Sequence, residues 1–332
     1  MKCNEGVKMK IKNIIKACVF VCIIMVLVSF TNTAFANEEG KPQFLVEAAP
    51  ANRVINEREN SIDVIFVGDS LAQAAFSPYE LWENYGFTSF VCGSSGQYMY
   101  ECYDYLNKVF ERQSPRVVVL EVDEIHRYST IEQYTLLRLA DQFSIINNHD
   151  RWKEKLNSLD PGTKINCYDY SYQEIQDNLK GYVYQRDIVP AKGYEDYMNN
   201  SNIYRQICTT NKVILHQINE LCKKNNASLV LVSVPSVLNC NNGRRAALLD
   251  VAEDMEVDFI DYNVGELKEE LALDWSVDTR DAGDHLSHPG MIKICRLFGA
   301  YLSEKYDLPD RRNDEEYRDW NEGLAVYHSI VG

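Results

Sequence analysis

Two short stretches, far apart in the chain, carry the residue types that a serine nucleophile and its base require. The first is Gly68-Asp69-Ser70-Leu71, and the second is the loop sequence around His285. A serine hydroxyl becomes a useful nucleophile when a neighbouring imidazole takes its proton, and a carboxylate beside the imidazole fixes its tautomer. We therefore identify Ser70 as a candidate nucleophile, His285 as its base, and Asp281 or Asp284 as the orienting carboxylate.

The elements around these stretches predict where the side chains lie. An apolar run at 62–67 ends at Gly68 and is typical of a buried parallel strand, and a helix is expected at 291–301, after the His285 loop. The glycine permits a tight turn that lifts Ser70 to the edge of the sheet where ligands bind. The alternative is that Asp69 or Ser70 only caps the helix that follows.

Strands and helices alternate through most of the remaining sequence. Further strands are predicted at 88–91, 117–122, 228–234 and 258–262, and helices at 77–85, 98–110, 203–224 and 244–255. This alternation predicts an α/β fold with three α/β/α layers, in which helices cover both faces of a flavodoxin-like, five-stranded parallel sheet.

Residues 124–202 interrupt the alternation and are interpreted as a partly helical insertion, with helices expected at 131–143 and 150–156. The insertion leaves the third strand at the ligand-binding edge, so we expect it to cover or extend the site. It is rich in tyrosine, at positions 168, 170, 172, 182, 184, 194 and 197. These rings can stack on sugars, but packing of the insertion is the favoured interpretation.

The N-terminus is typical of a secretory signal peptide. Five lysines between residues 2 and 16 precede an uncharged apolar run at 17–30, and Ala34-Phe35-Ala36 offers a cleavage site. The run is shorter than the roughly 20 residues that span a bilayer, so we predict cleavage after residue 36 and an extracytoplasmic protein, with a retained anchor as the alternative. We further predict a linker at 37–60, the α/β domain at 61–308 and a C-terminal extension at 309–332.

Charge and cysteine content exclude some classes of function. Residues 1–36 contain five lysines and one glutamate, so cleavage changes the net charge from −15 to −19 and argues against nucleic acid or an anionic membrane surface as partner. The seven remaining cysteines include no CxxC pair and no Cys/His pair at zinc spacing. We expect several of them to pack as small apolar side chains.

Together these motifs resemble the SGNH, or GDSL-like, hydrolases. Gly-Asp-Ser follows the first strand, the block Cys92-Gly93-Ser94-Ser95-Gly96-Gln97 follows the second, and His285-Leu286-Ser287-His288-Pro289-Gly290 precedes the last helix. The resemblance implies Ser70 as nucleophile and His285, rather than His288, as base. It also implies that Ser70 and Gly96, with Gly93 as the weaker alternative, donate backbone N–H groups to an oxyanion hole. Such sites need no metal or other cofactor.

Two features depart from the family pattern. The family supplies an Asn to the oxyanion hole after the third strand, whereas residues 119–126 contain none. The family's Asp stands three positions before its histidine, where this chain has Ala282. We prefer Asp281 to Asp284 as the orienting carboxylate, because a residue adjacent to the histidine seldom bends back onto its ring.

The sequences at 77–82 and 283–287 also resemble an extracytoplasmic branch that acts with membrane-bound O-acyltransferases on cell-envelope polysaccharides. This resemblance predicts an exported serine esterase that acts on acyl, and above all acetyl, esters of carbohydrate. Two alternatives stay open. One is an O-acyltransferase that uses the same acyl-enzyme, with a membrane-bound O-acyltransferase as partner, and the other is a non-catalytic glycan-binding protein.

Overall fold

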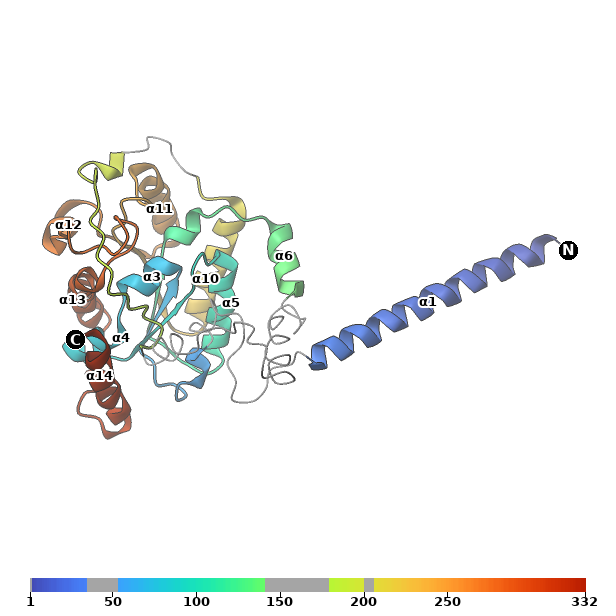
Figure 1. The fold of residues 1–332 in the computed structure, drawn as a ribbon, viewed down its shortest axis with the longest axis horizontal. Coiled ribbons are helices and arrows are strands. Elements are labelled where there is room, and N and C mark those ends of the chain that lie inside the picture. The colour runs from blue at the N-terminus through green and yellow to red at the C-terminus, as the bar shows by residue number, and fades with distance from the viewer. Residues whose placement is uncertain (1, 35–52, 141–178, 200–205) are drawn as a thin grey trace, which may run out of the picture. The chain divides into compact units, whose positions relative to one another are not determined.

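The computed structural model describes residues 2–34, 53–140, 179–199 and 206–332 (Figure 1). The chain divides into two compact units. Among the described residues, one unit contains the N-terminal helix and most of the helix at 131–140. The other unit contains the sheet and the helices around it, and all of the predicted site residues lie in it.

Five parallel strands form one sheet in the order β2-β1-β3-β4-β5. The strands are β1 (Val64–Gly68), β2 (Ser89–Gly93), β3 (Val117–Glu121), β4 (Ser228–Ser233) and β5 (Asp258–Asp261). Every residue of β1, β2 and β3 is buried, as expected for apolar strands that are covered on both faces. The predicted flavodoxin-like order is confirmed. Because β1 pairs with both β2 and β3, the turn after β1 is flanked by the turns after its two neighbours.

Helices cover both faces of this sheet (Figure 1). They are α3 (Ser70–Ala75), α4 (Pro78–Tyr85), α5 (Met99–Phe110), α10 (Thr209–Lys224), α11 (Asn242–Met255), α12 (Gly265–Leu271), α13 (His288–Lys305) and α14 (Arg318–Val331). α10 packs against α5 and α11, whereas α13 packs against α3, α4 and α12. The three-layer α/β/α prediction is therefore confirmed.

Local signals set the helix boundaries. Ser77 caps α4, and Gly86 ends it in a left-handed conformation with φ of 78°, so this helix spans the predicted residues. α13 is longer than the predicted 291–301, because the cap at Ser287 begins the helix at His288. The turn that carries the candidate base is therefore joined directly to a long helix that buries one face in the core.

Two of the predicted helices differ from the structure or lie partly outside it. The helix predicted at 203–224 begins at Thr209, because the backbone of Cys208 is extended, with φ of −63° and ψ of 150°. Of the helix predicted at 131–143, the structure describes α6 (Ile131–Ala140). The helix predicted at 150–156 lies outside the described residues, as do residues 203–205.

The C-terminal residues 309–332 pack onto the domain through three buried side chains, those of Tyr317, Trp320 and Tyr327. α14 packs against α4, where Trp320 is 1% exposed and its ring centre lies 5.3 Å from that of Trp82. Before α14, the Arg311 guanidinium donates two 2.8 Å hydrogen bonds to the carboxylate of Asp63, which precedes β1. The predicted C-terminal extension thus ties the end of the chain to the first strand and to α4.

The N-terminal segment forms one long helix, α1 (Lys2–Ala34). Its residues 11–34 are 24 consecutive helical residues with a hydropathy of 2.6, which is long and apolar enough to cross a membrane. A cleaved signal sequence near an N-terminus meets the same criterion. The expectation that the apolar segment is too short to span a bilayer is therefore corrected, and the length of α1 agrees with either an export signal or an anchor.

Replacing Trp320 with alanine tests whether the C-terminus belongs to the cooperative core. The change removes a buried ring, so we expect the free energy of unfolding to fall by about 3–5 kcal/mol in urea titrations followed by circular dichroism. Val326→Ala, at a position on α14 that is 43% exposed, is the matched control and should change it by less than about 0.5 kcal/mol. Equal losses in the two variants would contradict the packing described for α14.

Candidate active site

Ser70 is the first residue of α3 and follows directly on the turn after β1. The turn is tight, since a Cβ on Gly68 would lie 2.9 Å from the Cβ of Glu121 on the neighbouring strand. Asp69 caps α3 by accepting a 2.9 Å hydrogen bond from the backbone N–H of Leu71. The capping interpretation is therefore correct for Asp69, and it leaves the Ser70 side chain to make a different contact.

Ser70, His285 and Asp281 lie in one line of hydrogen bonds. His285 Nε2 is 2.8 Å from Ser70 Oγ, and His285 Nδ1 is 2.6 Å from Asp281 Oδ2. The second Asp281 oxygen accepts a 2.7 Å hydrogen bond from the backbone N–H of His285. When Nδ1 donates to the carboxylate, Nε2 carries the lone pair that can accept the serine proton. The histidine side chain is 15% exposed, so the line of hydrogen bonds opens toward solvent at the ring.

A sharp turn allows Asp281 to reach a histidine four residues later. Ala282 and Gly283 both have left-handed φ angles, of 64° and 101°. Gly283 N donates a 2.8 Å hydrogen bond to Thr279 Oγ1, which closes the turn. A Cβ at position 283 would lie 2.8 Å from Val237, so both the conformation and the space require glycine. This turn absorbs the extra residue between the aspartate and the histidine.

Asp284 contacts a different partner. Its Oδ2 is 3.6 Å from His285 Nδ1, too far for a hydrogen bond, and its Oδ1 accepts a 2.7 Å hydrogen bond from Asn239 Nδ2. Burial alone would raise the pKa of Asp281, but the hydrogen bonds from His285 outweigh it and lower that pKa below its ordinary value. Asp281 is therefore ionised at neutral pH and is the carboxylate in position to orient the imidazole.

The segment at 182–191, from the end of the predicted insertion, connects the two halves of the site. The backbone N–H of Val183 donates to the carbonyl of Gln73 in α3 at 2.9 Å. The carbonyl of Val189 accepts a 2.9 Å hydrogen bond from the backbone N–H of Ala282. These backbone contacts hold the helix of the serine and the loop of the histidine to one common segment.

Two tyrosines of the insertion, Tyr182 and Tyr197, pack in the interior and are each 2% exposed. Tyr197 OH donates a 2.9 Å hydrogen bond to Asn263, and Tyr182 OH lies 3.1 Å from His288 Nδ1. Burial lowers the pKa of His288, which sits among aromatic rings. The packing interpretation therefore holds for these two tyrosines, while positions 168, 170 and 172 lie outside the described residues.

The two glycines considered for the oxyanion hole lie at the end of β2 and in the turn that follows it. Gly93 ends that strand, and a Cβ there would lie 2.8 Å from Gln73 Cγ and 3.1 Å from the carbonyl oxygen of Asp69. Gly96 has a left-handed φ of 66°, and a Cβ there would lie 3.4 Å from Arg127 Nη1. Gly93 is thus close to the nucleophile turn, whereas the neighbour of Gly96 is Arg127, and the role of the Gly96 N–H stays a prediction.

Sequence reasoning missed Arg127, which follows the 3₁₀ turn after β3. Its Nη2 donates a 2.8 Å hydrogen bond to Asp69 Oδ2 and lies 3.7 Å from Asp123 Oδ2. Its guanidinium carbon is 5.6 Å from the ring centre of Tyr98. Its place in the sequence could have indicated it, because residue 127 directly follows residues 119–126, where the family's oxyanion-hole Asn was expected.

Three buried carboxyl groups lie beneath the nucleophile turn. Oxygens of Asp69, Glu121 and Glu124 are within 4.8 Å of one another, an arrangement that can hold a cation or share protons. Burial, reinforced by the neighbouring acids, raises the pKa of Glu121 and of Glu124 well above the ordinary range and raises that of Asp69 to about 6.

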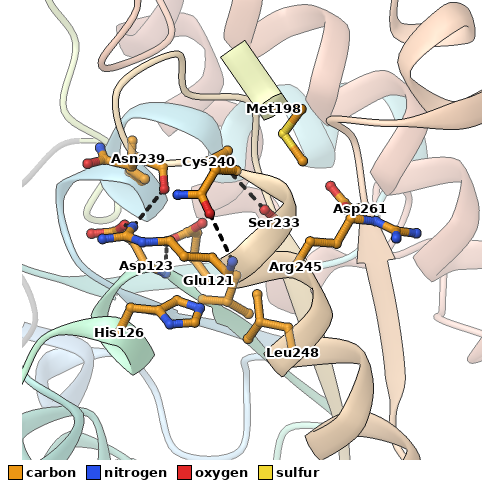
Figure 2. A pocket seen from close by; sticks show the side chains of 14 residues that line it. Glu121, Asp123, His126, Met198, Ser233, Asn239, Cys240, Arg245, Leu248 and Asp261 are labelled. Atoms are coloured by element: carbon orange, nitrogen blue, oxygen red, sulfur yellow. Dashed lines mark hydrogen bonds and ion pairs between the residues drawn. The ribbon is translucent and has the colours of Figure 1, made fainter. Parts of the chain in front are cut away.

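A small cavity lies beside these acids, next to the ends of β3 and β4 (Figure 2). Asp123 and Asn239 line it together with Arg244, whose Nη1 donates to Asp123 Oδ1 at 2.5 Å and to the carbonyl of Asn239 at 2.7 Å. The cavity of about 20 Å³ has room for about one water molecule and is too small for a sugar. A substrate must therefore reach Ser70 by another route.

Eight cysteines have side chains that the structure describes, and all eight are free. Cys92, Cys222 and Cys295 are buried, and burial raises the pKa of each thiol. A thiol that stays protonated in an apolar interior behaves as a small apolar side chain. This agrees with the expectation from the sequence.

Comparison with known proteins found no matching family model and no matching curated protein. Several solved structures are similar at low identity, among them two from Bacteroides species. A proposed acylhydrolase from Bacteroides fragilis is 12% identical, with a TM-score of 0.40 over 77% of this chain and 95% of that one. A GDSL-like lipase from Bacteroides thetaiotaomicron is 13% identical, with a TM-score of 0.38 over 76% of this chain and 95% of that one. Likenesses of this size do not assign an activity, so the proposals below rest on the geometry of this chain.

Replacing Asp281 with asparagine tests the assignment of the orienting carboxylate. An amide would donate to Nδ1 and favour the tautomer with a proton on Nε2, so we expect ester turnover to fall by about 10³–10⁴-fold. Asp284→Asn is the matched control, because its neighbour Asn239 contacts the side chain away from the imidazole, and it should retain most of the turnover. Turnover measured with p-nitrophenyl acetate that collapses in Asp284→Asn and survives in Asp281→Asn would reverse the assignment.

Proposed function

We propose that this protein is an exported serine acylhydrolase of the SGNH type that cleaves O-acyl, and above all acetyl, esters of carbohydrate. The observation that carries the proposal is the line of hydrogen bonds from Ser70 through His285 to Asp281, with contacts of 2.8 and 2.6 Å. A histidine with a packing role alone has no need of a carboxylate on one ring nitrogen and a partly exposed serine on the other. A nucleophile, a base and an orienting group need this arrangement.

The geometry is suited to a two-step reaction. Ser70 Oγ attacks the ester carbonyl while its proton passes to His285 Nε2, and Asp281 stabilises the imidazolium that forms. Collapse of the tetrahedral intermediate breaks the bond to the alcohol, which takes the proton from Nε2 and leaves the acyl group on Ser70. A water molecule activated by the same nitrogen then releases the acid and restores the serine.

Charge and the N-terminal helix support the class of substrate. The apolar helix at 11–34 is suited to export or anchoring, which would place the site outside the cytoplasm. The net charge of −15, which becomes −19 without residues 1–36, disfavours contact with an anionic lipid surface. An acyl ester on an extracellular or cell-envelope polysaccharide satisfies both conditions.

Transfer of the acyl group to a surface polysaccharide is the second candidate for the same site. In that reaction a sugar hydroxyl, instead of water, attacks the acyl group on Ser70. A membrane-bound O-acyltransferase would supply the acyl group, and an anchored α1 would keep the chain at the membrane beside such a partner. A non-catalytic glycan-binding role has less support, because binding alone does not require the Ser70–His285 contact.

A fluorophosphonate probe tests the nucleophile. We expect covalent labelling of the wild type, no labelling of Ser70→Ala, and labelling slowed by orders of magnitude in His285→Ala, because the hydroxyl then lacks its base. Ser329→Ala, which removes an exposed serine on α14, is the control and should label as the wild type does. Labelling of Ser70→Ala at the wild-type rate would exclude Ser70 as the nucleophile.

Whether the acyl group on Ser70 passes to water or to a sugar hydroxyl distinguishes hydrolysis from transfer. A hydrolase should release acetate from p-nitrophenyl acetate at a rate that added envelope oligosaccharide does not change. A transferase must hold an acceptor hydroxyl where water would otherwise attack, so proximity would divert acetyl to the sugar. Mass spectrometry of the oligosaccharide measures the difference. An acetylated sugar that forms with the wild type and not with Ser70→Ala would replace the hydrolase proposal with the transferase one.

A further inference from the structure

One cation, Arg127, bridges the turns that flank Ser70. β1 lies between β2 and β3, so the turn after β2, which contains Gly96, and the segment after β3, which contains Arg127, flank the turn that carries Ser70. Arg127 contacts both of the other turns. Its Nη2 donates to Asp69, the residue before Ser70, at 2.8 Å, and its Nη1 would be 3.4 Å from a Cβ on Gly96.

The guanidinium has donors that its neighbours do not use. Asp69 engages Nη2, whereas Nε is buried and has no hydrogen-bond partner among the residues that the structure describes. The side chain is still 32% exposed, so the group is open to a ligand on one side. The carboxylate of Asp69 and the face of the Tyr98 ring fix the position of the guanidinium. Its N–H groups are therefore oriented in advance and partly desolvated.

The proposed reaction creates a negative charge beside Ser70, the residue that follows the Arg127 partner Asp69. Attack of Ser70 on an ester moves the carbonyl π electrons onto the carbonyl oxygen, and the acids around the site would repel that charge. Asp69 lies in the turn itself and interacts with Asp123, and Asp281 lies on the side of the imidazole away from Ser70. A preorganised cation beside the serine would offset this field and stabilise the transition state.

We propose that Arg127 is a catalytic residue that donates a hydrogen bond to the oxyanion formed on attack by Ser70. The inference rests on the proposed serine mechanism. As the Oγ–carbon bond forms, the serine proton goes to His285 and the carbonyl oxygen becomes an anion that accepts from the guanidinium. When the intermediate collapses, the carbonyl double bond re-forms, the bond to the alcohol breaks and the alcohol takes the proton from His285. Arg127 keeps all its protons throughout.

Steady-state kinetics of Arg127→Gln with p-nitrophenyl acetate tests this role. Loss of one oxyanion donor should lower kcat by about 10²–10³-fold with little change in KM, because the interaction exists only in the transition state. Arg127→Lys retains the positive charge without the planar guanidinium, so its kcat should lie between those of Arg127→Gln and the wild type. Arg244→Gln is the matched control, since Arg244 also pairs with Asp123 but does so at the small cavity, and its kcat should stay near that of the wild type.

Binding of a boronic acid separates catalysis from a structural role. The boronate forms an anionic tetrahedral adduct with the serine, so Arg127→Gln should weaken its binding by about the factor lost in kcat/KM. A fall in kcat with unchanged boronate affinity would show that the site is intact but that Arg127 does not contact the oxyanion, and would overturn the proposal. Unchanged kcat, with KM raised only for esters that carry a carboxylate, would also overturn it in favour of substrate recognition. Each of those results leaves the serine mechanism intact, whereas a wild type that fluorophosphonate does not label would refute the mechanism itself.

Discussion

One hydrogen bond, the 2.8 Å contact between Ser70 Oγ and His285 Nε2, joins the first strand of the sheet to the loop before α13. It can form only if two segments 215 residues apart reach the same edge of the sheet. Parallel pairing makes this edge common to all the strands, the tight turn at Gly68 brings the serine to it, and the left-handed turn at Ala282 and Gly283 directs the histidine back toward it. The backbone contacts of residues 182–191 with α3 and the histidine loop then hold both segments in place.

The acid-rich surroundings of the serine impose a second constraint. Burial raises the pKa of Glu121 and of Glu124, so these groups favour the neutral form, while Arg127 and Arg244 pair with Asp69 and Asp123. Asp281 stands apart, because the hydrogen bonds from His285 lower its pKa and keep it ionised. Among these groups, the proposed reaction uses the charges of Arg127 and Asp281.

The sequence predicted those parts of the structure that depend on local pattern. Apolar runs of strand length and the helix signals at Ser77 and Gly86 define the sheet and α4, and the spacing of Ser70 and His285 from neighbouring elements predicted which edge they share. Arg127 was not predicted, because its partner Asp69 is 58 residues away and nothing local marks the pair. The choice of Asp281 rested on a steric argument, whereas the turn at Ala282 that makes its contact possible is a left-handed conformation that few non-glycine residues adopt.

The central claim is that Ser70 carries the acyl group during turnover. Rapid acid quenching of the enzyme during reaction with p-nitrophenyl acetate, followed by proteolysis and mass spectrometry, measures this directly. We predict one added acetyl group on the peptide that contains Ser70, formed at a rate at least equal to kcat and absent from His285→Ala on the same timescale. Turnover at the wild-type rate with acetyl on another residue, or with no acetylated peptide in either the burst or the steady state, would contradict the account.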